Sequence, residues 1–323
     1  MRNEALSDVL KVWLYAAASV LLGAWISPLL YNMGKGLAEV SLAKQTNGPL
    51  EWLAGVCRAA DFPAFFVAGL LVSGGILFLP FTRWLRGGRQ PGASGGQRLR
   101  KNPRGPRQAV TGFAGVAVLF LLFAGILIFG GLFAWKSPGE AVAKIALRGF
   151  AAALGLALLQ EILFRGIATG IFLRAMRPAA ALGLAAVLFA LVHFLNPPPG
   201  LDVPDPDAAG TGFELLRKIA AQFSDPRVVL GTFTPLLALG GVLAYARWRT
   251  ASLWLPAGLH AGWIFVNGIL GSVTVAASRP DSLVWLLSGP SLKQGLLPLA
   301  GIVLAGVLTA RLTASADAAD TPA

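Results

Sequence analysis

The sequence predicts an all-α fold, a polytopic membrane bundle of about eight transmembrane helices. Hydrophobic residues make up 55% of the 323 positions, and charged residues make up 13%, about half the share found in soluble domains. The apolar residues form continuous runs near the length that crosses a bilayer, without the alternation of barrel strands. A soluble enzyme of this length is excluded, because it would need far more polar surface.

Eight stretches along the chain are mainly apolar and near the length that crosses a bilayer, so each is expected to form a transmembrane helix. We expect them at about 12–31, 62–81, 109–135, 148–174, 179–195, 228–246, 251–270 and 295–312. The first is a retained span rather than a signal peptide, because its apolar run is long and Glu4 and Asp8 precede it. The sole cysteine, Cys57, excludes an intrachain disulfide.

The basic residues predict the orientation. The loop 82–108 carries many arginines and no acidic residue, which places it in the cytoplasm. Alternation then puts both termini in the cytoplasm, and the Ala-, Gly-, Arg- and Pro-rich composition indicates a bacterial inner membrane. The net charge of +12 is thus explained by topology, so we expect no nucleic-acid partner. Contact of this loop with anionic lipids is an alternative to a purely topological role.

The loop at 196–227 is expected to contain a short amphipathic helix on the membrane surface. Phe213, Leu216, Ile219 and Phe223 share one helical face, opposite Glu214 and its basic neighbours.

Three regions are expected along the chain. They are an N-terminal membrane region (1–139), a core (140–275), and a final span with a tail that is disordered from Thr313 (276–323).

Four ionisable residues lie deep inside the predicted spans: Glu161, Arg165, His193 and His260. Burying such groups in hydrocarbon is costly, so they should face the bundle interior and mark a site. At about 1.5 Å per residue, Glu161, His193 and His260 lie roughly 20, 22 and 15 Å from the cytoplasmic ends of their helices. The alternatives are a structural Glu161–Arg165 ion pair and histidines that only join helices.

Three motifs in order resemble those of the CPBP intramembrane proteases, which include type II CAAX prenyl endopeptidases and Abi bacteriocin-immunity proteins. Residues 160–166 read QEILFRG, similar to the EExxxR motif; residues 189–193 read FALVH, similar to FxxxH; and His260 opens the third motif. The resemblance covers about 140–275. It implies an endopeptidase that hydrolyses a peptide bond of a membrane-associated protein or peptide.

Two departures affect the roles that the resemblance implies. Gln160 replaces the first glutamate, and Ile264 stands where the third motif has asparagine. Carried over, Gln160 and His193 would activate the water, but a neutral amide cannot accept its proton. Glu161 would replace Gln160 only if the helix rotates or deforms, since adjacent residues point about 100° apart. Otherwise His193 acts alone with Gln160 orienting the water, or the protein is a silent scaffold or immunity protein.

The predicted site is Glu161, His193 and His260, with Arg165 holding Glu161 ionised. His260 remains a donor to the oxyanion, and Asn267, two turns along the same helix, would assist if that helix is distorted. The resemblance implies no cofactor; a zinc ion on Glu161, His193 and His260 is the alternative. A proton-coupled transporter is a third class, but the sequence shows no inverted repeat.

Overall fold

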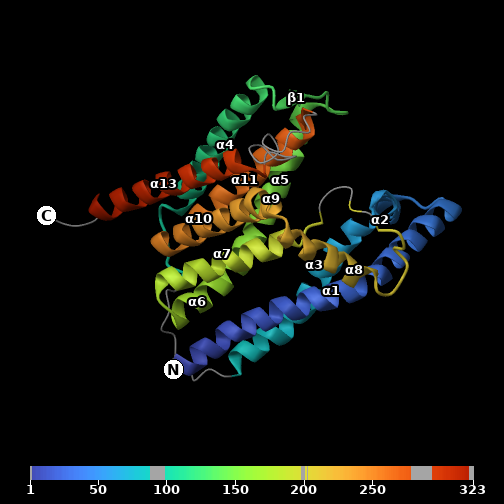
Figure 1. Ribbon diagram of the computed structural model, residues 1–323, viewed down its shortest axis with the longest axis horizontal. Helices are drawn as coiled ribbons and strands as arrows, with labels where there is room; N and C mark the ends of the chain where they lie inside the picture. Colours follow the sequence, from blue (N-terminus) through green and yellow to red (C-terminus); the bar gives the residue numbers. More distant parts are fainter. Residues whose placement is uncertain (1, 88–98, 198–200, 202, 278–292, 320–323) are drawn as a thin grey trace. The chain divides into compact units, whose positions relative to one another are not determined.

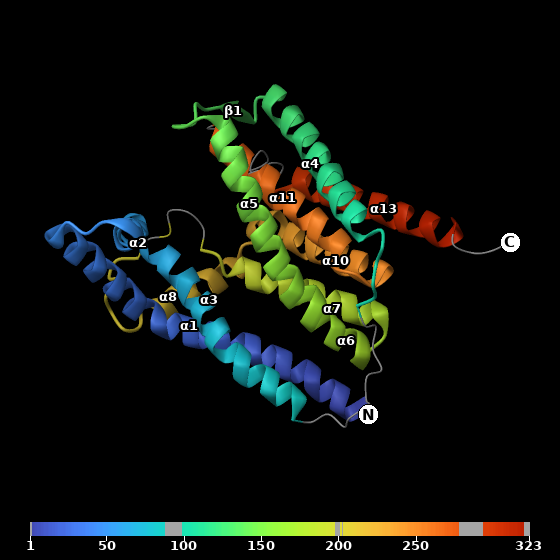
Figure 2. The same cartoon turned by 180° about the vertical axis from the view of Figure 1, so that it is seen from behind.

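The computed structural model describes residues 2–87, 99–197, 201, 203–277 and 293–319, and these residues are almost entirely helical (Figures 1 and 2). This confirms the predicted all-α class. The middle of the basic loop (88–98) and the last four residues of the tail lie outside the described residues. The chain divides into two compact units, Met1–Ala93 with Val192–Ser224, and Ser94–Leu191 with Asp225–Ala323. The three regions expected from the sequence stay a prediction.

The first unit is built on one long helix, α1 (Arg2–Lys44), which packs against the other helices of the unit. These are α2 (Gly48–Ala59), α3 (Phe62–Arg86) and α8 (Thr211–Ala221), which leads into the short turn η2 (Gln222–Ser224). Glycine allows α1 and α3 to approach closely, because a Cβ placed on Gly69 would lie 2.7 Å from the carbonyl oxygen of Gly23. The Ser73 hydroxyl then donates to the carbonyl oxygen of Ser19 at 2.6 Å.

The helix expected in the 196–227 loop is present as α8, and the side that packs on α1 shares only Ile219 with the apolar face expected at the membrane surface. Leu215 and Ile219 are buried against α1, whereas Phe213 is 40% exposed. The face is set by Gly212, where an added Cβ would lie 1.9 Å from the carbonyl oxygen of Ala24. Because a glycine makes the closest approach, a search for large apolar residues misses this side of the helix.

The second unit contains the elements that form the deep site. In order they are α4 (Gly105–Phe129), β1 (Phe133–Trp135), α5 (Val142–Glu161), the wide π-helical turn η1 (Ile162–Ala168), α6 (Thr169–Ala175), α7 (Pro178–Phe194), α9 (Pro226–Val228), the π-helical turn η3 (Val229–Phe233), α10 (Thr234–Thr250), α11 (Trp254–Val273), β2 (Thr274–Ala276) and α13 (Leu296–Ala319). The last three residues of α7 are assigned to the first unit.

Each of the eight expected spans overlaps a helix, and six of the described helices are long and apolar enough to cross a membrane. At 17 residues α7 is shorter, and α11 has 20 residues but is not among the six. The expected third span is too long at its end. Its helix stops at Phe129, because Gly130 and Gly131 follow and Gly131 adopts a φ of +70°. Beyond these glycines, β1 pairs antiparallel with β2.

The C-terminal tail also differs from the expectation. Helix α13 continues to Ala319, so the backbone is helical for several residues beyond Thr313, where disorder was predicted. Four of the six residues from 314 to 319 are alanine, the best helix former, and they extend a helix whose earlier part packs on α10 and α4.

The core of the second unit lies among α4, α7, α10, α11 and α13. Its largest buried members include Phe120, Leu127, Phe189, Leu243 and Ile302. Helix α11 lies beside both α4 and α5, as Figure 2 shows. Two glycines in α11 allow the contact with α4, because a Cβ on Gly258 would lie 2.1 Å from the Ala109 carbonyl oxygen and one on Gly262 would lie 2.6 Å from that of Phe113.

Replacing Gly258 with alanine is expected to destabilise the protein by roughly 1–3 kcal/mol, because the new methyl group must push α4 away. The matched control is Gly268→Ala in the same helix, where an added Cβ meets nothing within 4 Å. Since alanine is the better helix former, the control should be neutral or slightly stabilising. Thermal unfolding of the purified protein in detergent measures both, and equal midpoints for the two variants would contradict the close contact.

Candidate active site

The centre of the site is the carboxylate of Glu161, the last residue of α5. Its side chain is 0% exposed. One oxygen, Oε1, accepts a hydrogen bond from Arg165 Nη1 at 3.0 Å and lies 2.7 Å from His260 Nδ1. The other oxygen, Oε2, is buried and has no hydrogen-bond partner among the residues that the structure describes. We call Glu161, Arg165 and His260 the carboxylate cluster.

Arg165 ties the carboxylate cluster to two neighbouring helices. It lies in η1 and is 1% exposed. Its Nη2 donates to the carbonyl oxygen of Gly240 in α10 at 3.2 Å, and its guanidinium lies 4.3 Å from the ring centre of Phe189 in α7. An arginine held this way neutralises the buried carboxylate without access to water.

His260 approaches Glu161 from α11 and is 3% exposed. Its ring meets Phe189 edge to face at 5.6 Å. An ionised carboxylate only accepts hydrogen bonds, so opposite an ionised Glu161 the Nδ1 of His260 is the donor. A neutral His260 then carries its lone pair on Nε2, which is the arrangement of a histidine held by a carboxylate as a general base.

The wide turn η1 begins directly after Glu161. Glu161 was expected to replace Gln160 only if its helix rotates or deforms. The structure has this wide turn after Glu161, whereas Gln160 and Glu161 both lie in the regular helix α5. Turns of this kind insert one residue into a helix, and they often occur at functional sites. Here the turn contains Arg165, the partner of Glu161. The expected structural ion pair is thus present, and it shares its carboxylate oxygen with a histidine from another helix.

The structure gives the helix and the burial of each of the other predicted residues, Gln160, Asn267 and His193. Gln160 is half-buried on α5. Asn267 is buried on α11, but its Nδ2 donates to the Trp263 carbonyl oxygen of its own helix at 2.8 Å, and it lies seven residues, or about 10 Å, from His260 along the axis. His193 is half-buried in the last turn of α7 and belongs to the first unit, so its place beside the carboxylate cluster stays a prediction.

Two residues that contact the carboxylate cluster, Phe189 and Gly240, were not predicted from the sequence. Phe189, 0% exposed, packs on Arg165, His260 and Phe164. It opens the FALVH motif, which could have drawn attention to it. Gly240 offers no such signal among the 39 glycines. Its importance is spatial, since a Cβ there would lie 3.0 Å from Ala186 of α7.

The alternative zinc site on Glu161, His193 and His260 stays a prediction. Within the described ranges, no three His, Cys, Asp or Glu side chains gather closely enough to hold a metal ion. Glu161 and His260 would supply two ligands, but the Arg165 guanidinium, 3.0 Å from the shared oxygen, opposes a divalent cation. This donor set favours a charge-neutral carboxylate and arginine pair.

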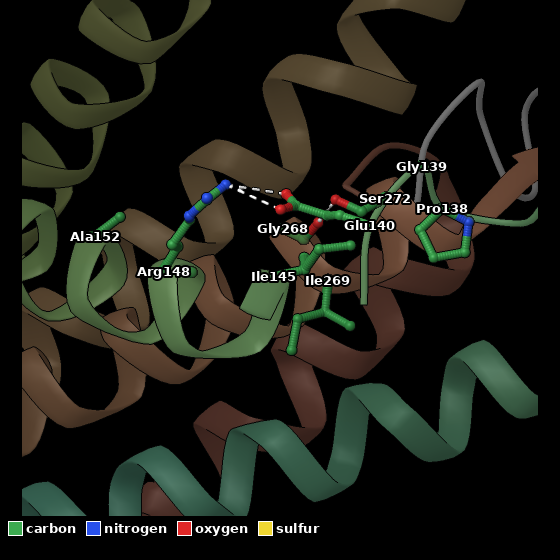
Figure 3. Close-up of a pocket in the computed structure, with 10 residues that line it drawn as sticks. Pro138, Gly139, Glu140, Ile145, Arg148, Ala152, Gly268, Ile269 and Ser272 are labelled. Carbon is green, nitrogen blue, oxygen red and sulfur yellow. Dashed lines mark hydrogen bonds and ion pairs between the residues drawn. The ribbon is translucent and has the colours of Figure 1, made fainter. Parts of the chain in front are cut away.

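A pocket of about 750 Å³ opens at the other end of α5 (Figure 3). It lies between the loop before α5, the first half of α5 and the end of α11. Within it Arg148 donates to both oxygens of Glu140 at 3.1 Å. None of the carboxylate cluster lines it, and its nearest wall on α5, at Ala152, is nine residues, or about 14 Å, from Glu161 along the helix. The pocket is therefore separate from the carboxylate cluster.

The fold and site define an integral membrane protein of apolar helices that buries a carboxylate, histidine and arginine cluster. Residues 142–266 match the family model described as type II CAAX prenyl endopeptidase Rce1-like. This confirms the resemblance seen in the motifs and identifies an Rce1-like domain in the chain. The match includes Glu161, Arg165, His193 and His260, and it ends one residue before Asn267. No curated protein and no solved structure matches the chain.

Proposed function

We propose that the protein is an intramembrane endopeptidase that hydrolyses a peptide bond of a membrane-associated protein or peptide. The observation that carries the proposal is the Glu161 carboxylate, fully buried, with Oε1 shared by His260 and Arg165. A buried ion pair needs no histidine to be stable. A histidine added to it, in an Rce1-like domain, is the arrangement expected of a proton acceptor.

In the proposed reaction the Glu161–His260 pair accepts one proton from a water molecule. The water oxygen forms a bond to the carbonyl carbon, and the carbonyl oxygen becomes an oxyanion. When the intermediate collapses, the C–N bond breaks and the same proton passes to the leaving amine. Glu161 stabilises the imidazolium formed in between, and Arg165 holds the Glu161 carboxylate in place at 3.0 Å. The Oε2 atom, which has no hydrogen-bond partner in the described chain, is a second acceptor for the water.

His193 enters the proposal from the sequence alone, through its motif and its depth in the membrane. Because the Glu161–His260 pair supplies the base, His193 is assigned to the oxyanion as a donor, and Gln160 to orienting the water. In the roles that the resemblance implies, His193 activates the water and His260 binds the oxyanion, and the proposal exchanges these two roles. The exchange also accounts for Gln160. With His260 as the base, the residue at the first motif position does not have to accept a proton, so a neutral amide is sufficient there.

The setting of the reaction follows from the charges. We propose a bacterial inner membrane with both termini in the cytoplasm, supported by the arginines of the 82–108 loop, which would also contact anionic lipids. We propose that no resident metal takes part, supported by the donor set around Glu161. Activity that survives a metal chelator would agree, and activity restored only by added zinc would contradict this.

A silent scaffold or immunity protein is the second candidate, favoured by Gln160 and Ile264. Quantitative mass spectrometry of new N-termini in membranes separates the two. Cells that express the wild type should show cleaved membrane proteins that are lost in cells with His260→Ala or His193→Ala, at equal expression. Identical N-termini in wild-type and variant membranes would support the silent protein and overturn the endopeptidase.

A further inference from the structure

The two wide turns of the second unit end in the same way. Thr169 follows η1, and both its backbone N–H and its hydroxyl donate to the Phe164 carbonyl oxygen, the hydroxyl at 2.8 Å. Thr234 follows η3 and makes both bonds to the Val229 carbonyl oxygen, the hydroxyl at 3.0 Å. In an α-helix a threonine hydroxyl reaches three or four residues back. Here it reaches five, so each hydroxyl fits the wide turn and not the regular one.

Arg165 is the functional residue that η1 holds. It is the residue after Phe164, whose carbonyl Thr169 binds twice. The Phe164 ring packs on Phe189 at 5.3 Å, and Phe189 in turn lies under the Arg165 guanidinium. The wide turn therefore determines the direction from which Arg165 reaches Glu161. Thr169 itself is 0% exposed, so its hydroxyl is available to this turn and shielded from bulk water.

We propose that Thr169 is a positioning residue of the active site, which acts through Arg165. Its hydroxyl stabilises the wide turn over the regular helical turn, and the wide turn keeps Arg165 on the carboxylate oxygen that Glu161 shares with His260. The inference rests on the proposed function for its effect on catalysis, but its effect on the turn is independent of catalysis. None of the three sequence motifs includes Thr169.

The structure supplies a matched set of variants. Thr169→Val replaces the hydroxyl with a methyl group of similar volume, and Thr169→Ser restores a hydroxyl. Thr234→Val removes the equivalent bond from η3, which contains none of the carboxylate cluster. On a membrane peptide that the wild type cleaves, in proteoliposomes, Thr169→Val should lower kcat by about tenfold, the size of effect expected when one hydrogen bond is lost. KM should not change, Thr169→Ser should recover most of kcat, and Thr234→Val should match the wild type.

Hydrogen–deuterium exchange of the peptides that cover 162–169 and 229–234 is the second measurement, and it needs no activity. Thr169→Val should speed exchange in 162–169 only, and Thr234→Val in 229–234 only. Unchanged exchange in 162–169 would overturn the proposal even if the wild type cleaves nothing. With an active wild type, an unchanged kcat for Thr169→Val, or an equal loss for Thr234→Val, would also overturn it. A wild type that cleaves no peptide overturns the proposed function alone.

Discussion

Glu161→Gln is expected to lower kcat by about 10² to 10⁴-fold, the range that a lost general base produces. The amide keeps the size of the side chain but carries no charge, so it neither stabilises a protonated His260 nor takes up a proton from water. The rate of product formation in proteoliposomes, with a peptide found by mass spectrometry of new N-termini, measures the effect. Neighbouring Gln160 cannot compensate, because it is an amide as well.

The control for this variant is Glu214→Gln in α8. Glu214 pairs with Lys218 at 3.4 Å with the same four-residue spacing as Glu161 and Arg165, but its side chain is 50% exposed. This variant should cleave at the wild-type rate. If Glu161→Gln retains the wild-type rate as well, the carboxylate cluster is structural and has no part in hydrolysis.

Arg165→Met is expected to cause the largest loss of stability, about 3–5 kcal/mol, because it leaves the Glu161 carboxylate buried without its cation. The variant also lacks the hydrogen bond from Arg165 to the Gly240 carbonyl oxygen and the contact of Arg165 with Phe189. Unfolding of the purified protein by denaturant in detergent measures the change. The matched control, Lys218→Met, breaks a pair whose side chains are 26% and 50% exposed and should cost about 0–1 kcal/mol.

Removing the Glu161 charge as well separates the electrostatic effect of Arg165→Met from its effect on packing. The double variant Glu161→Gln, Arg165→Met contains no unpaired buried charge and should recover much of the stability lost in Arg165→Met. A double variant as unstable as the single one would show that the arginine acts through its packing.

The sequence was sufficient to identify the residues of the carboxylate cluster, for a physical reason. In a chain with 13% charged residues, an ionisable group inside an apolar run is costly and therefore conspicuous. The four-residue spacing of Glu161 and Arg165 predicted their ion pair. The depth comparison predicted that Glu161 and His260 lie at a similar level, and the structure joins them at 2.7 Å.

Other features depend on contacts that a single sequence does not display. The wide turn after Glu161 depends on one hydroxyl, that of Thr169, which in the sequence is indistinguishable from any helical threonine. The buried face of α8 depends on Gly212, which has no side chain to mark it. The contact of Arg165 with α10 uses a backbone carbonyl, at Gly240, and a backbone atom leaves no signal in the residue types.

The double variant Glu161→Gln, Arg165→Met also tests the central claim, that the carboxylate cluster hydrolyses peptide bonds. The measurement is the rate at which this variant, purified and shown by its unfolding curve to be folded, cleaves a membrane peptide that the wild type cuts. The proposed mechanism predicts a rate at least about a hundredfold below that of the wild type. Cleavage by the folded double variant at the wild-type rate would contradict it.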